Sequence, residues 1–167
     1  MKKVYYSWEQ VEGAVLDIAR QMSAQDWKPD YIVGITRGGL IPANLLSQYT
    51  GIKMHTLNVS LRDGDGGESN LWMAEEAFNQ SKKILVVDDI NDSGATLKWI
   101  KQDWQSSCLP NDPIWINGIW NNNVRVAVLY DNESSKSELT VDYSAVTINK
   151  AEEDVWIDFP WESWWTR

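Results

Sequence analysis

The sequence predicts an α/β domain built on a doubly wound, mainly parallel sheet. Residues 84–87 form a continuous apolar run, typical of a strand that is buried on both faces of a sheet, residues 31–36 read as another buried strand, and residues 124–130 are also predicted to form a strand. Helical patterns separate these runs, and an alternation of strand and helix favours parallel pairing through right-handed crossovers. With 167 residues and 43% hydrophobic residues, the chain suits one compact domain that spans residues 1–167.

The elements of the first half follow from capping and turn residues. Ser7 and Gln10 have the spacing of a capping box, and apolar residues then recur at helical spacing. A second helix is predicted over residues 40–49, where Gly51 closes it. A strand over residues 53–60 follows.

The second half continues the same alternation. A helix is predicted over residues 71–80, before the central apolar run, and another over residues 96–106, after it. Eleven Trp residues are the outlier in composition. Most of them are expected to pack in a core or an interface, and the others could stack on a flat heterocycle.

Charge and composition narrow the class of function. The formal net charge is −9 and no basic run is present, which argues against a nonspecific nucleic-acid surface. A single Cys108 excludes an internal disulfide, and no apolar stretch has the length of a signal peptide core or a membrane span. We therefore expect a cytoplasmic protein without nucleic-acid or membrane partners. If its substrate is acidic, a cation is needed to balance the charge.

The end of the central run carries the most informative chemistry. Asp88 and Asp89 follow the strand directly and are predicted to lie at the carboxyl edge of the sheet, where open α/β sheets hold their ligands. Residues 91–96 form a small, hydroxyl-rich turn before a helix, which is a ready site for a phosphate. Because carboxylates repel an anion, the pair must hold something else, either sugar hydroxyls or a divalent cation.

A second candidate turn follows the first strand. Gly38 and Gly39 would let the backbone approach a ligand closely, and Arg37 offers a planar donor fork that suits phosphate oxygens. The turn matches neither a Walker loop nor a dinucleotide-binding motif, so by itself it is equally compatible with an ordinary strand-to-helix connection.

The segment 84–97 resembles the signature of the type I phosphoribosyltransferases. The resemblance implies that Asp88 and Asp89 bind the ribose diol of phosphoribosyl pyrophosphate and, directly or through water, Mg²⁺. It implies that the turn binds the 5′-phosphate, through residues that we list here: Asn91, Ser93, Gly94, Ala95 and Thr96. It also makes the turn of Arg37, Gly38 and Gly39 a pyrophosphate loop, with a cis peptide expected at Thr36–Arg37.

Residues 61–70 are polar and have the length of a small lid. An EF-hand is excluded, because Gly67 and Glu68 stand where a ligand and the required Gly belong. In the family a catalytic lid falls at this point, and Arg62 is a candidate to reach the pyrophosphate when the lid closes.

The segment 155–162 is similar to the tail of microbial xanthine-guanine and hypoxanthine-guanine phosphoribosyltransferases. The resemblance implies a hood over residues 131–167, in which Trp156 stacks on a purine and the backbone of Ile157 hydrogen-bonds the purine's exocyclic edge. An aromatic plug that docks the tail onto the core is the alternative. Asp92 is the candidate catalytic residue, since a carboxylate there can accept the N7 proton of the base, and Asp at this point is typical of enzymes for 6-oxopurines.

Two departures from the family leave questions open. The family's purine-reading Lys is replaced by Asp131 and Asn132; Asn132 could donate to an oxo group, Lys136 could substitute for the Lys, or Asp131 could favour an amino group. Residues 107–123 are longer than the family's connection and could cover the sheet or form an oligomer contact.

Three functions remain in view. The first is a purine salvage phosphoribosyltransferase that uses Mg²⁺ and, like its family, assembles as a homodimer or homotetramer. The second is a non-catalytic regulator that binds phosphoribosyl pyrophosphate, and the third is a phosphoribosyltransferase for another acceptor.

Overall fold

The computed structural model describes residues 1–59, 71–108, 110 and 112–167, and its centre is a five-stranded parallel sheet. The strand order is β3-β2-β4-β5-β6, and every pair in it is parallel. The strands of this sheet are β2 (Tyr31–Thr36), β3 (Met54–Asn58), β4 (Ile84–Asn91), β5 (Val124–Asn132) and β6 (Tyr143–Ile148). The predicted α/β fold with a mainly parallel sheet is confirmed. The predicted lid at residues 61–70, with Arg62, lies outside the described residues.

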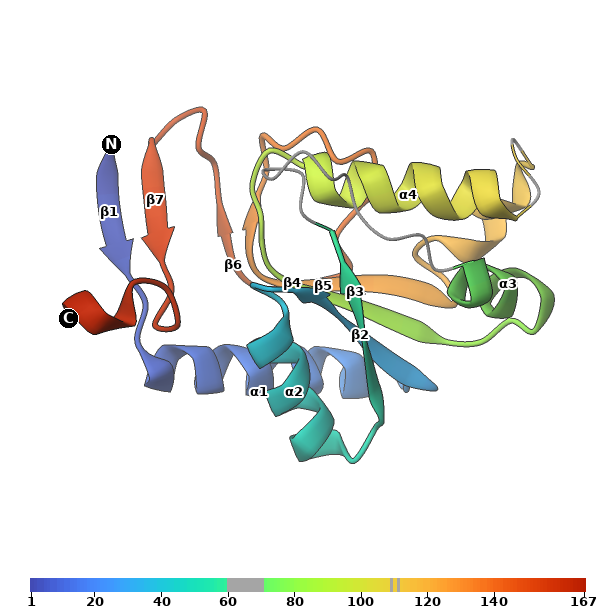
Figure 1. Ribbon diagram of the computed structural model, residues 1–167, viewed down its shortest axis with the longest axis horizontal. Helices are drawn as coiled ribbons and strands as arrows, with labels where there is room; N and C mark the ends of the chain where they lie inside the picture. The colour runs from blue at the N-terminus through green and yellow to red at the C-terminus, as the bar shows by residue number, and fades with distance from the viewer. Residues whose placement is uncertain (60–70, 109, 111) are drawn as a thin grey trace.

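Helices cover both faces of this sheet (Figure 1). On one face lie α1 (Trp8–Ala24) and α2 (Leu40–Thr50), and on the other lie α3 (Leu71–Asn79) and α4 (Ala95–Ser107). The alternating sides of the strands therefore face two separate cores, as expected for strands buried on both faces.

Local signals position the helix ends as the sequence predicted. The Gln10 N–H donates to Ser7 Oγ at 3.1 Å and the Ser7 N–H donates to Gln10 Oε1 at 2.8 Å, which completes the capping box of α1. Gly51 follows α2 with φ of 75°, a left-handed conformation that favours glycine.

Residues 112–123 cover one end of the sheet, which is the first of the two roles considered for the segment 107–123. It contains a short π-helix, η1 (Trp115–Ile119), and Trp115 is fully buried. Trp120 stacks on Trp104 of α4 with ring centroids 5.6 Å apart, while Trp115 Nε1 donates to the Cys108 carbonyl at 2.8 Å. The two Trp residues of this segment, Trp115 and Trp120, therefore pack in the core.

Three strands were not predicted. β6 extends the main sheet, whereas β1 (Lys2–Tyr5) and β7 (Val155–Asp158) form a separate two-stranded parallel sheet. Figure 1 shows this pair beside the edge of the domain, next to both ends of the chain. A short 3₁₀ turn, η2 (Trp164–Thr166), follows β7.

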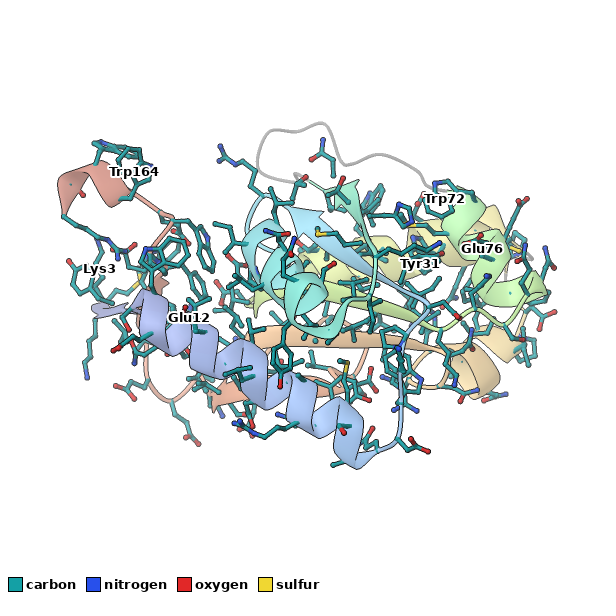
Figure 2. All side chains as sticks on the ribbon, turned by 90° about the horizontal axis from the view of Figure 1, so that it is seen from below. Lys3, Glu12, Tyr31, Trp72, Glu76 and Trp164 are labelled. Carbon is teal, nitrogen blue, oxygen red and sulfur yellow. The ribbon has the colours of Figure 1, made fainter. Side chains whose placement is uncertain are left out.

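Aromatic residues also close the far edge of the sheet. Tyr31 Oη donates to Glu76 Oε2 at 2.7 Å, and the Tyr31 ring lies 5.8 Å from that of Trp72. Figure 2 labels these three side chains at the same end of the molecule. Burial and this acidic partner raise the pKa of Tyr31 far above its usual range. Within residues 1–59, 71–108 and 112–167, no helix combines the length and the apolar character that a membrane crossing needs.

Candidate active site

The β2–α2 loop lies directly against the carboxyl end of β4. A Cβ atom on Gly38 would overlap the Asp89 carboxylate, and one on Gly39 would overlap the Val87 carbonyl oxygen. A larger residue would have to displace the Asp89 side chain at position 38 and the backbone of β4 at position 39. The Thr36–Arg37 peptide is cis, as the family resemblance implied, and the Arg37 side chain is exposed beside the loop.

Asp88 and Asp89 form the acidic pair at the end of β4. The Asp89 N–H donates to Asp88 Oδ1 at 2.9 Å, and the Ile90 N–H donates to Asp89 Oδ1 at 2.7 Å. Burial, followed by the negative charge of Asp89, raises the pKa of Asp88 well above its usual range. The pair is therefore short of positive charge, and bound hydroxyl donors or a cation would relieve it.

The donor set fits Mg²⁺ as a cofactor bound together with a substrate. Among the described residues, no group of three or more His, Cys, Asp or Glu side chains is placed to hold a metal ion. Mg²⁺ does not need such a cage, since it is usually held by one or two carboxylates together with substrate phosphates and water. Asp88 and Asp89 match that pattern.

The turn after β4 begins helix α4, and the Ala95 N–H donates to Ser93 Oγ at 3.3 Å. Gly94 precedes the helix with φ of 92°, and a Cβ on it would overlap the backbone of Ser137. Ser93 and Ala95 are exposed and Thr96 is partly exposed, while the first turn of α4 has no acidic residue. The start of a helix, with its dipole and the nearby hydroxyls of Ser93 and Thr96, is a suitable place for a phosphate, which would replace the contact of Ala95 with Ser93.

Asn91 differs from its predicted place in that turn. It is the last residue of β4, pairs in register with Asp131 and is only 4% exposed. Its Nδ2 donates to Asp131 Oδ1 at 2.9 Å and to Ser135 Oγ at 2.8 Å. The side chain of Asn91 therefore joins the ends of β4 and β5 and does not face the phosphate turn.

Asp92 lies where the phosphate turn meets the C-terminal part of the chain. Its Oδ1 lies 2.9 Å from Nζ of Lys150, whose side chain is 17% exposed. The same Nζ lies 6.0 Å from the centroid of the Trp156 ring. The structure thus brings together the predicted catalytic Asp92, the predicted platform Trp156 and Lys150, a cation that the sequence analysis did not single out.

The residues at the expected position of the family's Lys are occupied with other contacts. Asn132 is 5% exposed; its Nδ2 donates to the Asp92 carbonyl at 2.8 Å, and its Oδ1 accepts from the Lys150 N–H at 2.9 Å. Asp131 accepts from Asn91, and Lys136 is exposed, with its backbone N–H donating to the Ser93 carbonyl at 2.9 Å. Asn132 therefore connects the backbone of Asp92 with that of Lys150, and a contact of its amide with a base stays a prediction.

The backbone of Ile157 faces the open edge of β7. The Lys2 N–H donates to the Asp154 carbonyl at 3.1 Å and the Tyr6 N–H donates to the Asp158 carbonyl at 2.9 Å, so these even-numbered positions point toward β1. Backbone groups alternate between the two edges of a strand, and the N–H and C=O of Ile157 therefore point away from β1. That orientation fits the predicted backbone contact with a base.

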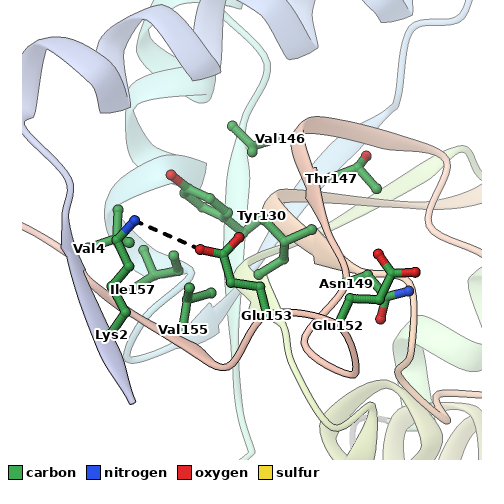
Figure 3. Close-up of a pocket in the computed structure, with 11 residues that line it drawn as sticks. Lys2, Val4, Tyr130, Val146, Thr147, Asn149, Glu152, Glu153, Val155 and Ile157 are labelled. Atoms are coloured by element: carbon green, nitrogen blue, oxygen red, sulfur yellow. Dashed lines mark ion pairs between the residues drawn. The ribbon is translucent and has the colours of Figure 1, made fainter.

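A pocket of about 460 Å³ lies next to this site, on the other face of β7 (Figure 3). Val155 and Ile157 line it together with Tyr130, and an ion pair of Lys2 and Glu153 at 3.8 Å stands at its rim. Trp156 alternates with Val155 and Ile157 along the strand and so faces away from this pocket.

Comparisons with known proteins agree with this geometry. A family model described as the phosphoribosyl transferase domain matches residues 2–164. The chain is 27% identical over 165 residues to the xanthine-guanine phosphoribosyltransferase of Idiomarina loihiensis, which covers 96% of this chain and 88% of that one. The crystal structure of a purine phosphoribosyltransferase from Pyrococcus horikoshii has a TM-score of 0.67 and 26% identity, with 98% and 96% of the two chains covered. A xanthine-guanine-hypoxanthine enzyme from Helicobacter pylori shares the fold, with a TM-score of 0.69, 22% identity and coverage of 98% and 95%.

A parallel sheet with a phosphate turn and an acidic pair at its carboxyl edge defines a class of α/β proteins that handle sugar phosphates. Because the family model spans nearly the whole sequence, the chain belongs to the phosphoribosyl transferase domain family. The predicted family, and with it the prediction of a phosphoribosyltransferase, is confirmed.

Proposed function

We propose that this protein transfers the 5-phosphoribosyl group from phosphoribosyl pyrophosphate to a 6-oxopurine, with release of pyrophosphate. The observation that carries the proposal is the position of Asp92, which directly follows β4 and contacts Lys150, whose Nζ also lies over the ring of Trp156. The names of the relatives from Idiomarina loihiensis and Helicobacter pylori, which include xanthine and guanine, support a 6-oxopurine acceptor.

The donor is held by backbone and carboxylate groups. The turn of Ser93 to Thr96 binds the 5′-phosphate, and the loop of Arg37, Gly38 and Gly39 binds the pyrophosphate. Asp88 and Asp89 accept hydrogen bonds from the ribose hydroxyls and hold Mg²⁺ together with the phosphates; when bound, the ion neutralises charge on the leaving group. These groups position the donor so that its C1 faces the base.

The acceptor is held by the hood. The base stacks on Trp156, hydrogen-bonds the backbone of Ile157 and presents N7 to Asp92. As the bond from C1 to pyrophosphate loosens and the base nitrogen attacks, the Asp92 carboxylate accepts the N7 proton. Closure of a lid at residues 61–70, a cytoplasmic location and assembly into a dimer or tetramer stay predictions.

The test is pyrophosphate release from phosphoribosyl pyrophosphate and Mg²⁺, measured with guanine, xanthine, hypoxanthine, adenine and a pyrimidine. We expect turnover with the 6-oxopurines. Turnover with a pyrimidine or another acceptor, and with none of the 6-oxopurines, would mean that the proposed acceptor is wrong. Binding of phosphoribosyl pyrophosphate without turnover for every base would indicate a regulator.

The Asp92→Asn variant tests the assigned base. It should lose about 10²- to 10⁴-fold in kcat, the usual contribution of a positioned proton acceptor, and bind phosphoribosyl pyrophosphate as the unchanged protein does. Asp154→Asn, which alters an exposed carboxylate before β7, is the matched control and should keep full activity. An unchanged rate in Asp92→Asn would remove Asp92 from this role.

A further inference from the structure

We propose that Lys150, in the turn between β6 and β7, is the residue that selects a 6-oxo over a 6-amino purine. The inference rests on the proposed function and concerns its acceptor. It assigns the choice of base to a side chain that lies 18 residues along the chain from the end of β5, where Asp131 and Asn132 stand in place of a Lys.

The first observation is where the ammonium lies. Nζ of Lys150 is 2.9 Å from Asp92 Oδ1 and 6.0 Å from the centre of the Trp156 ring. If a heterocycle stacks on Trp156 and one of its nitrogen atoms faces Asp92, the ammonium lies next to the substituent beside that nitrogen on the same edge of the base. The side chain is 17% exposed, so its charge is only partly screened by water.

The second observation is that the turn is anchored to the site. The Lys150 N–H donates to Asn132 Oδ1 at 2.9 Å, and Asn132 Nδ2 donates to the Asp92 carbonyl at 2.8 Å. Asn132 thereby ties the backbone of Lys150 to the backbone of Asp92. This connection places the ammonium and the carboxylate side by side as a fixed pair of donor and acceptor.

The chemistry of the purine edge matches that pair. On a 6-oxopurine, N7 and O6 are adjacent, so a base with a proton on N7 presents a donor to Asp92 and an acceptor to Lys150. Adenine carries an amino group in place of O6, and an ammonium has donors only. Its amino group would face Lys150 donor to donor, which selects against adenine by an unfavourable contact.

Other described cations near this part of the chain are engaged or lie outside the site. Lys98 and Lys101 both pair with Glu138, at 3.6 and 3.7 Å. Lys136 is exposed, and Arg37 belongs to the pyrophosphate loop. Lys150 is the ammonium that the ion pairs place at Asp92.

The experiment compares binding of inosine monophosphate and adenosine monophosphate to the full-length protein and to Lys150→Met, by titration calorimetry. The two nucleotides share the ribose phosphate and N7 and differ only at position 6 and in the proton on the neighbouring N1, so the change in the ratio of their dissociation constants on removal of Lys150 reports on this part of the base. We expect the unchanged protein to prefer inosine monophosphate and Lys150→Met to lose about 10- to 100-fold of that preference, the range of a charge-assisted hydrogen bond. Lys150→Arg, which keeps a charged donor, should retain part of it.

Controls separate this role from a structural one. Lys2→Met removes an exposed cation that pairs with Glu153 in the same turn and should leave the ratio unchanged. Binding of phosphoribosyl pyrophosphate to Lys150→Met should equal that of the unchanged protein, which shows that the donor side is folded.

The result that overturns the inference is a ratio in Lys150→Met equal to that of the unchanged protein, or an unchanged protein without preference. If the ratio falls as expected but no base supports pyrophosphate release, Lys150 keeps its assignment and the proposed catalysis fails.

Discussion

The two halves of the site are held together in different ways. On the donor side, Gly38, Gly39 and Gly94 each lie so close to neighbouring backbone or to Asp89 that a Cβ atom would overlap it. On the acceptor side, the contacts run between side chains, through Asn132 and the ion pair of Lys150 with Asp92.

This difference shows where the site can change. A contact with backbone that excludes any Cβ, as at Gly39 and Gly94, tolerates no substitution, whereas a contact between side chains can be replaced by one from another element. The donor side follows the family pattern closely, while the acceptor side lacks the family's Lys and has a Lys from a different turn. A change in acceptor therefore leaves the donor side untouched.

The largest effect expected within this comparison is that of Gly38→Ala. The added methyl must displace either the Asp89 carboxylate or the loop, and a misplacement of about 1 Å can cost 10²-fold in rate. We expect kcat/KM for phosphoribosyl pyrophosphate to fall by about that factor in a pyrophosphate-release assay.

Gly13→Ala is the matched control, because a Cβ at this exposed position of α1 meets no atom within 4 Å. It should keep full activity and raise the free energy of unfolding by about 0.5–1 kcal/mol. Full activity in Gly38→Ala would show that the donor side tolerates substitution as well as the acceptor side does.

A smaller effect, confined to the acceptor, is expected for Trp156→Leu. Loss of stacking on a base costs about 1–3 kcal/mol, so KM for the base should rise roughly tenfold or more while KM for phosphoribosyl pyrophosphate stays the same. Trp164→Leu, at a position that is 66% exposed, is the control and should change neither constant. An equal change in both constants for Trp156→Leu would mean that the two sides are not independent.

The smallest effect concerns stability on the donor side, in protein freed of metal with a chelator. Because the folded state raises the pKa of Asp88 above its ordinary value of 3.8, its ionisation costs stability as the pH rises through and beyond that value. Asp88→Asn should therefore melt at a higher temperature, by about 2–4 °C for each kcal/mol recovered.

The increase in melting temperature caused by Asp88→Asn should be small near pH 3.8 and should grow toward neutral pH. Circular dichroism at a series of pH values measures it. A pH-independent difference would mean that the ionisation of Asp88 is not what lowers the stability of the folded state. Glu12→Gln, an exposed change on α1, serves as the control.

Sequence reasoning succeeded where the signal is local. A few neighbouring residues are enough to predict each of these features: the capping box of Ser7 and Gln10, the buried strands β2, β4 and β5, and the turn before α4. β1 and β7 were missed because each has four residues and their pairing joins the two ends of the chain. Lys150 was missed for the same reason, since its contact with Asp92 depends on how β6 and β7 are placed.

The pairing of Lys3 with Trp156 in the parallel sheet of β1 and β7 has a practical consequence for work with this protein. A variant that lacks residues 1–6 would retain every group assigned to the sugar phosphate and lose the strand against which the aromatic platform is aligned. An affinity tag or fusion partner that is joined to residue 1 therefore needs a spacer between it and β1. A spacer that is too short would show itself as a loss of affinity for the purine.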